Sequence, residues 1–169
     1  MLRVKSVRTI GFVGDNEQIV RALTCPLAGM NKPDCFYYKS ALYRVEDVDD
    51  ASVRVVVFSA VDLFCNMADL LEMCDCQKSV VYITDCAKAS RAGYIIDKKR
   101  LGYMLDCPVV FDRGKTVRGL NKLLSCVHIV SDTPTFCSAY QNPTLAVRSV
   151  IRLKLGILYK IKLMLKKYI

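Results

Sequence analysis

The sequence predicts an α/β domain with a mostly parallel sheet flanked by helices, followed by a separate basic segment. Short β-rich runs alternate with helical patterns along the first 130 residues. One of these runs, residues 79–83, is almost entirely apolar, as in strands that helices cover on both faces. No Asp or Glu follows Asp132, although Lys and Arg are frequent beyond it. We therefore expect an α/β domain over residues 1–130, a linker over 131–145 and a basic amphipathic helix over 146–169.

The composition is that of a globular protein without a conventional transmembrane helix. Hydrophobic residues make up 53% of the 169 residues, yet no stretch of about 18 residues is free of charge. The first residues are basic and lack an apolar signal core, so we expect an unsecreted, cytoplasmic protein. Its nine cysteines are then expected to be reduced, and those in apolar runs to be buried as small hydrophobic residues: Cys65, Cys107 and Cys126.

The first part of the sequence predicts strands and one helix. Residues 7–13 form an apolar β-rich run that ends at Gly14, and residues 15–24 have apolar positions at helical spacing. A loop with Pro and Gly follows. Residues 36–45 and 52–60 are predicted to form two strands joined by a turn.

Two features of these strands invite a functional interpretation. The acidic stretch 46–50 between them is expected to be a solvated hairpin turn, because it lacks the pattern of a calcium loop. Tyr37 and Tyr43 are expected to share one face of a strand while Tyr38 points away. We expect these rings to pack on the sheet rather than to stack on nucleic-acid bases.

The second part predicts an alternation of helices and strands. Asp62 is expected to cap a helix with inward-facing apolar residues. Helices are also predicted over residues 96–105 and 116–127, and a short strand over 108–111. The inward-facing positions of the helix after Asp62 are expected to be Leu63, Met67, Leu70, Leu71 and Met73.

The basic segment 146–169 has an apolar stripe at helical spacing, although strict alternation over 151–155 and 161–165 leaves a strand as the alternative. One interpretation docks the stripe on the domain. The other places an interfacial helix on an anionic membrane or on a partner's helices. The cations that would face headgroups or the partner are Arg152, Lys154, Lys160, Lys162, Lys166 and Lys167.

A family resemblance enters through ordered motifs. Residues 10–18 resemble the start of a GTPase phosphate loop. Residues 79–110 resemble a segment of the GTPase domain of FeoB-type ferrous iron transporters: a buried strand, an Arg-Ala-Gly step, an Ile-Ile-Asp helix start, two leucines four apart and Cys-Pro-Val-Val. Residues 118–124 resemble the last helix of that domain. The resemblance implies a P-loop GTPase-like, or Ras-like, fold.

The resemblance also implies nucleotide-binding residues that this sequence lacks. Gly14 remains from the phosphate loop, but Asp15, Asn16, Glu17 and Gln18 replace its Gly-Lys-Thr/Ser core. The magnesium-associated Asp-x-x-Gly would lie in residues 58–62, and the switch threonine near Tyr37. The base-reading motif corresponds to Thr84, Asp85, Cys86 and Ala87, in which Ala87 replaces the carboxylate. We therefore expect a pseudo-GTPase with no catalytic residue and no cofactor.

Other motifs receive structural interpretations. Residues 114–116 spell Gly-Lys-Thr but are expected to begin a helix, and His128 has no hydrolase context. Cys65, Cys74 and Cys76 lack zinc-site spacing and are expected to be structural.

The expected function is a non-hydrolysing binding or regulatory module linked to ferrous iron transport. Its expected partner is a protein, such as an iron-transporter component, and no nucleic acid is expected. The oligomeric state is left open. The alternatives are a cysteine-rich metal or redox-sensing protein, and a weak GTP/GDP sensor.

Overall fold

A computed structural model describes residues 7–14, 17, 35–39, 41–74, 78–112, 116–133 and 143–153. Its centre is a six-stranded sheet with the order β2-β3-β1-β4-β5-β7. All neighbouring strands are parallel except the β2–β3 pair. The mostly parallel α/β fold predicted from the sequence is thus confirmed. The strands are β1 (Val7–Gly14), β2 (Cys35–Tyr38), β3 (Ala41–Val45), β4 (Val53–Ser59), β5 (Ser79–Thr84) and β7 (Val109–Phe111).

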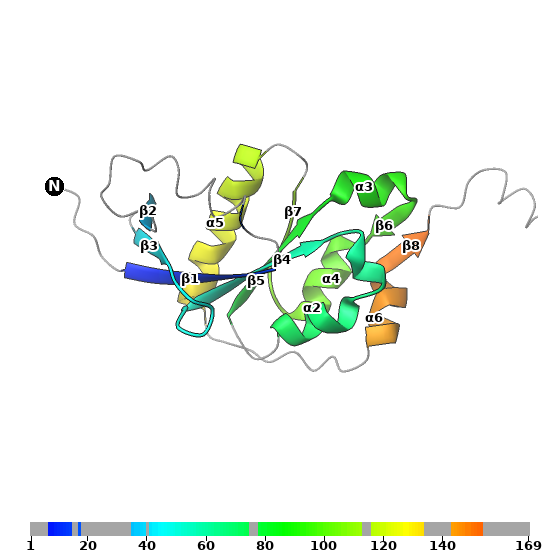
Figure 1. Cartoon of the computed structure of the whole chain (residues 1–169), viewed down its shortest axis with the longest axis horizontal. Helices are drawn as coiled ribbons and strands as arrows, with labels where there is room; N and C mark the ends of the chain where they lie inside the picture. The colour runs from blue at the N-terminus through cyan, green and yellow to red at the C-terminus, as the bar shows by residue number, and fades with distance from the viewer. Residues whose placement is uncertain are drawn as a thin grey trace, which may run out of the picture.

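Helices cover both faces of this sheet (Figure 1). Helix α5 (Thr116–Asp132) packs on one face, where Leu123 and Val127 are buried. Helices α2 (Met67–Cys74) and α4 (Lys98–Leu105) pack on the other. The β5 residues, buried from Ser79 to Ile83, show why that segment of the sequence is apolar almost throughout.

Two helix starts differ from their predicted positions. Asp62 lies in a short 3₁₀ helix, η2 (Asp62–Phe64), and does not cap α2. The helix predicted over residues 96–105 begins at Lys98, because the Asp97 side chain accepts a hydrogen bond from the Arg100 amide at 3.1 Å. Ile96 instead ends a strand, β6 (Tyr94–Ile96), which follows helix α3 (Cys86–Arg91).

The segment 46–52 connects β3 to β4 and crosses directly over β1. Val45 at the end of β3 and Val53 at the start of β4 both pair with Ile10, on opposite sides of β1. The chain therefore steps across one strand without returning along the sheet, which explains how it manages without the crossover of about a dozen residues that parallel strands usually need. The hairpin turn predicted here is wrong, since β3 and β4 do not pair.

Hydrogen bonds and close packing hold the crossing segment on β1. The Glu46 amide donates to the Ile10 carbonyl at 3.0 Å, and the Ser52 hydroxyl donates to the Thr9 carbonyl at 2.8 Å. A β-carbon on Gly11 would lie 2.7 Å from Val48 Cα, which is closer than nonbonded carbons approach. Glycine at this position is therefore required by the crossing.

The tyrosines of β2 and β3 lie differently from the prediction. Because β2 and β3 form an antiparallel hairpin, Phe36 pairs with Tyr43 and Tyr38 with Ala41. Tyr38 and Tyr43 therefore face α5 together, and the solvent-exposed ring is that of Tyr37. A turn within residues 36–45 reverses the chain, so alternation cannot be counted through it.

The C-terminal segment departs most from the sequence prediction. Helix α6 (Pro143–Val150) starts within the predicted linker and ends at Val150. Strand β8 (Ile151–Leu153) follows and pairs antiparallel with β6, so the expected single helix over 146–169 is wrong for residues 151–153. The alternating pattern noted there corresponds to this strand. Lys154 and the residues after it, like residues 134–142, lie outside the described part of the chain.

The described part of the C-terminal segment docks on the domain. Ala146 and Val150 of α6 are buried in the cluster formed with α2 and α4. The Asp97 amide donates to the Val150 carbonyl at 2.8 Å, and Arg100 donates to the Ser149 carbonyl at 3.3 Å. No helix among the described residues is long and apolar enough to cross a bilayer.

Candidate functional site at the carboxyl edge of the sheet

The parallel strands end along one edge of the sheet, where Gly14, Ser59, Thr84 and Phe111 are the last residues of β1, β4, β5 and β7. The chain adds β3 on one side of β1 and β4 on the other, which makes β1 the point at which the strand order reverses. Ligands of open α/β sheets bind outside the carboxyl ends of strands at such a point. Both the phosphate-loop and base-reading segments implied by the resemblance begin at this edge.

Gly14 is held in place by the neighbouring strand. Its φ of 93° is favourable for glycine, and a β-carbon there would collide with the Val57 carbonyl oxygen. Packing between β1 and β4 therefore accounts for this glycine without any bound phosphate. Glu17 is exposed and helical, whereas Asp15, Asn16 and Gln18 lie outside the described residues.

The base-reading segment has its polar groups engaged within the protein. Asp85 adopts a left-handed backbone with φ of 52°, and its carboxylate contacts Lys88 Nζ at 2.7 Å. Its other carboxylate oxygen lies 3.4 Å from the Ser59 hydroxyl. The Thr84 hydroxyl points back to the Phe58 carbonyl at 3.4 Å. Ala87 is exposed and offers no hydrogen-bonding side chain.

Tyr82, Cys86 and Asp112 form a second polar group beside this segment. Burial, and to a smaller extent the nearby Asp112 carboxylate, raises the pKa of Tyr82 to about 12. Burial and then Asp112 also raise the pKa of Cys86 to about 11. The Cys86 thiol is consequently neutral near pH 7, and it lies 3.4 Å from the Ile83 carbonyl that accepts its hydrogen bond. These groups are poor nucleophiles and serve as packing and hydrogen-bonding elements.

Sequence reasoning missed several residues of this edge. Asp112 directly follows β7, and Ser59 ends β4, so both stand where side chains of parallel strands converge. A systematic inspection of the residue after each predicted strand would have found Asp112. Lys88 gave no comparable signal, because helix α3 was not predicted.

The described residues of this edge carry more negative than positive charge. Asp62 in η2, Asp85 after β5 and Asp112 after β7 supply three carboxylates, whereas Lys88 is paired with Asp85 and Lys98 lies over the Phe111 ring at 5.8 Å. The segment 58–62, where the magnesium-associated motif was expected, ends β4 and enters η2. Such an arrangement repels a polyphosphate unless cations intervene.

The cysteine candidates are dispersed over the described structure. Cys65 is exposed, which corrects the expectation that it is buried, because the chain leaves η2 there before α2 begins. Cys74 is buried at the end of α2. Its hydrogen bond with Cys107, together with the burial of Cys107, raises the pKa of the Cys107 thiol. Cys76 lies outside the described residues. Within the described ranges no three His, Cys, Asp or Glu side chains are grouped as metal ligands.

His128 belongs to a polar network on the opposite side of the domain from this edge. Its Nδ1 lies 3.0 Å from Arg8 Nη1 and 2.7 Å from the Tyr43 hydroxyl. Since the guanidinium can only donate, Nδ1 accepts and the ring is neutral. Burial, and to a smaller extent the positive charge of Arg8, lowers the pKa of His128. Arg8 also binds Asp132 at 2.9 Å, so the network fastens β1 and β3 to α5.

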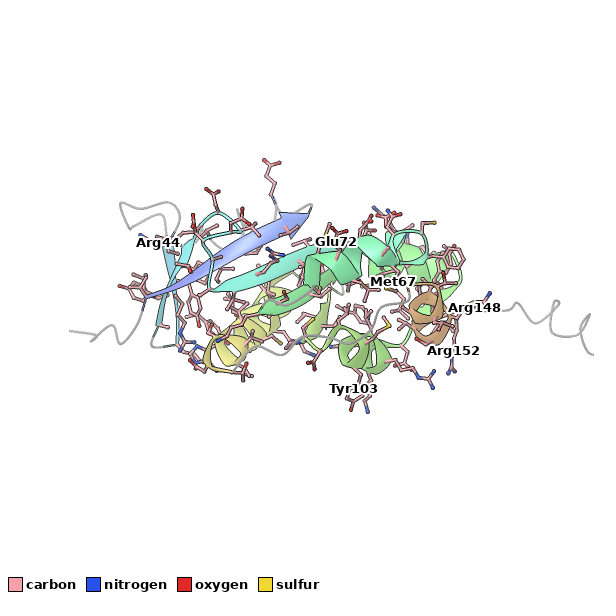
Figure 2. The ribbon with its side chains drawn as sticks, turned by 90° about the horizontal axis from the view of Figure 1, so that it is seen from below. Arg44, Met67, Glu72, Tyr103, Arg148 and Arg152 are labelled. Atoms are coloured by element: carbon pink, nitrogen blue, oxygen red, sulfur yellow. The ribbon has the colours of Figure 1, made fainter. Side chains whose placement is uncertain are left out.

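Of the six cations predicted to face a membrane or a partner, Arg152 is the one that the described structure includes. It is exposed on β8, and it lies at the end of the molecule opposite Arg44 (Figure 2). The remaining predicted cations, Lys154, Lys160, Lys162, Lys166 and Lys167, lie outside the described residues.

The sheet order and the helices on both faces match a P-loop GTPase-like fold. No protein-family model matches the sequence, and the search of curated proteins found no match. Solved structures do match. The chain has the fold of a FeoB-type G domain.

Three of these structures illustrate the likeness. The G-domain of FeoB from M. jannaschii has a TM-score of 0.59 and 18% identity, over 75% of this chain and 99% of that one. The apo cytosolic domain of T. maritima FeoB has a TM-score of 0.56 and 20% identity, over 81% of this chain and 67% of that one. The L. pneumophila FeoB cytosolic domain has a TM-score of 0.57 and 14% identity, over 79% of this chain and 66% of that one.

Proposed function

We propose that this FeoB G-domain-like module binds a partner or regulates it without hydrolysing GTP. One observation carries the proposal: β1 ends at the carboxyl edge of the sheet, and the residues that follow it in the sequence, in place of the phosphate-loop core, are Asp15, Asn16, Glu17 and Gln18. They provide no lysine for the phosphates and no hydroxyl for magnesium, and they add two carboxylates. Hydrolysis depends on those electrostatic contributions.

The base-facing segment supports the same proposal. Ala87 has no carboxylate for a guanine edge, and the Asp85 carboxylate is occupied by Lys88. A nucleotide would have to share the Asp85 carboxylate with Lys88, which already neutralises its charge.

Titration with fluorescent GTP and GDP, with and without magnesium, tests the proposal. We expect no saturable binding at micromolar nucleotide and no release of phosphate from GTP. The FeoB G-domain of M. jannaschii serves as the control protein of the same fold. Micromolar affinity or magnesium-dependent turnover in this chain would overturn the proposal.

The proposed partner is a protein component of ferrous iron transport, because the matching structures are described as parts of iron transporters. The proposed location is the cytoplasmic side of the membrane, with the basic C-terminal residues facing anionic headgroups. Co-sedimentation with liposomes that contain an anionic phospholipid tests this location. A chain ending at Leu153 should lose the binding. Equal sedimentation of both chains would count against a membrane role for residues 154–169.

A further inference from the structure

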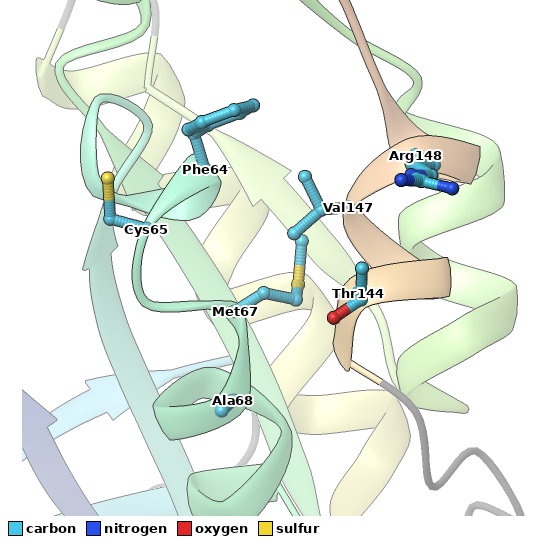
Figure 3. A pocket seen from close by; sticks show the side chains of 7 residues that line it. All are labelled: Phe64, Cys65, Met67, Ala68, Thr144, Val147 and Arg148. Atoms are coloured by element: carbon cyan, nitrogen blue, oxygen red, sulfur yellow. The ribbon is translucent and has the colours of Figure 1, made fainter.

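A pocket of about 450 Å³ lies between the η2–α2 segment and α6, and the function proposed above does not use it (Figure 3). It exists because α6 docks beside α2 without filling the space next to η2. The residues that line it are Phe64, Cys65, Met67, Ala68, Thr144, Val147 and Arg148.

One wall of the pocket is apolar and combines an exposed aromatic ring with a buried methionine. The Phe64 ring is 49% exposed and is stacked on Tyr94, with ring centroids 5.9 Å apart and planes inclined by 29°. Met67 is buried at the base of this wall, and its side chain extends toward Val147 in Figure 3. An apolar group placed here would contact the Phe64 ring, which is already stacked on Tyr94, and the buried Met67 side chain.

The other wall adds polar groups from α6. Thr144 and Arg148 are four residues apart, so they lie on the same side of the helix. Arg148 is the charged residue among those that line the pocket. Acidic residues of the opposite wall are exposed on η2 and α2 but do not line the pocket: Asp62, Asp69 and Glu72. The charge distribution therefore places a negative group of a ligand at α6, next to Arg148.

We propose that this pocket binds an amphipathic monocarboxylate, with its apolar chain between Phe64, Met67 and Val147 and its carboxylate at Arg148. The volume corresponds to about 15 water-sized groups, which suits an acyl chain of about eight to twelve carbons with its carboxylate. Small-molecule sites of about 300–1,000 Å³ with apolar walls and a few polar groups are common. The proposal does not depend on the absence of GTP hydrolysis.

Decanoate, used below its micelle-forming concentration, is the test ligand for the full-length chain. Binding is measured by calorimetry and by protection of the exposed Cys65 from alkylation, read by peptide mass spectrometry. We expect decanoate to bind saturably and to slow Cys65 alkylation. Decyltrimethylammonium, which carries the opposite charge on the same chain, should bind at least about fivefold more weakly. Equal effects of the two ligands, or no effect of decanoate, would overturn the proposal.

Two variants locate the binding. Arg148→Gln should weaken decanoate binding about fivefold, whereas Arg152→Gln, at an exposed arginine outside the pocket, should change it less than twofold. Ala68→Trp fills the pocket from an exposed helix position and should abolish binding without unfolding the chain, which circular dichroism checks. Unchanged affinity in Ala68→Trp, or equal losses in the two arginine variants, would contradict the assigned site.

Discussion

Replacing Gly11 with alanine tests whether segment 46–52 lies directly on β1. The added β-carbon would be 2.7 Å from Val48 Cα and 2.9 Å from Ala51 Cβ. Both contacts involve the crossing segment itself, which is tied to β1 by the Glu46 and Ser52 hydrogen bonds. The segment must therefore shift away from the strand or lose these bonds.

The expected loss of stability combines two effects. Overpacking of this kind costs about 1–3 kcal/mol. Replacing glycine by alanine also restricts the unfolded chain, which offsets about 0.4–1 kcal/mol of that cost. A net destabilisation of about 0–2.6 kcal/mol remains, centred on about 1.3 kcal/mol, for which the melting temperature of a domain of this size falls by about 3–5 °C.

Gly102→Ala is the matched control. Gly102 lies inside α4, and its added β-carbon would be 3.5 Å from the Cys107 carbonyl oxygen, an ordinary contact. Alanine is favoured in a helix by about 0.8–1 kcal/mol, so this variant should be more stable than the parent chain. The two substitutions thus have opposite expected signs.

Urea unfolding followed by circular dichroism measures both variants. An unchanged dependence of the unfolding free energy on urea would show that neither substitution alters the surface exposed on unfolding, so that the shifts in midpoint report changes in stability. If Gly11→Ala is as stable as the parent while Gly102→Ala is stabilised, segment 46–52 does not cross at Gly11.

Gly14, His128 and Cys86 give three further tests. Gly14→Ala should destabilise the chain by at least about 1–2 kcal/mol in the same urea assay, because φ is 93° and the Val57 carbonyl blocks the β-carbon. His128→Asn keeps an acceptor but removes a titrating ring. Because the folded-state pKa of His128 is lowered, the parent should lose stability as pH falls below about 6.5, and the variant should lose less. Cys86, whose pKa is about 11, is about 0.1% thiolate at pH 8 and should be alkylated far more slowly than exposed Cys65.

Each of these tests has a contrary outcome. A Gly14→Ala chain as stable as the parent would mean that β1 and β4 approach less closely at this edge. Parallel stability curves for the parent and His128→Asn between pH 7 and pH 5 would rule out the proposed neutral ring. Equal labelling of Cys65 and Cys86 in the native chain, as expected only in urea, would contradict the raised pKa of Cys86.

The central strands were largely predictable because a strand that is buried on both faces consists almost entirely of apolar residues. The apolar run 79–83 became β5, and residues 109–111 became β7 close to their predicted bounds. Pairing was less predictable. The acidic stretch 46–50 has the composition of any exposed turn, and only the register of β1 with both neighbours shows that it crosses a strand.

The C-terminal segment shows a second limit of sequence patterns. Ile151 and Leu155 fit an apolar helical stripe, and together with Leu153 they also fit an alternating strand, so periodicity alone could not choose. The choice depends on β6, which offers unpaired backbone groups to residues 151–153 from a distant part of the chain. β6 was itself concealed, because Ile96 also fitted the start of the next helix.

The candidate site illustrates how a structural and a functional explanation can share one residue. Gly14 supported the phosphate-loop resemblance because working loops need glycine for their turn. In this fold the same glycine is required by the Val57 carbonyl, whatever ligand the edge holds. Gly14 therefore carries information about how β1 packs on β4 and none about nucleotide binding. The functional argument depends instead on the sequence after β1, where Asp15 and Glu17 supply carboxylates, and on the methyl group of Ala87.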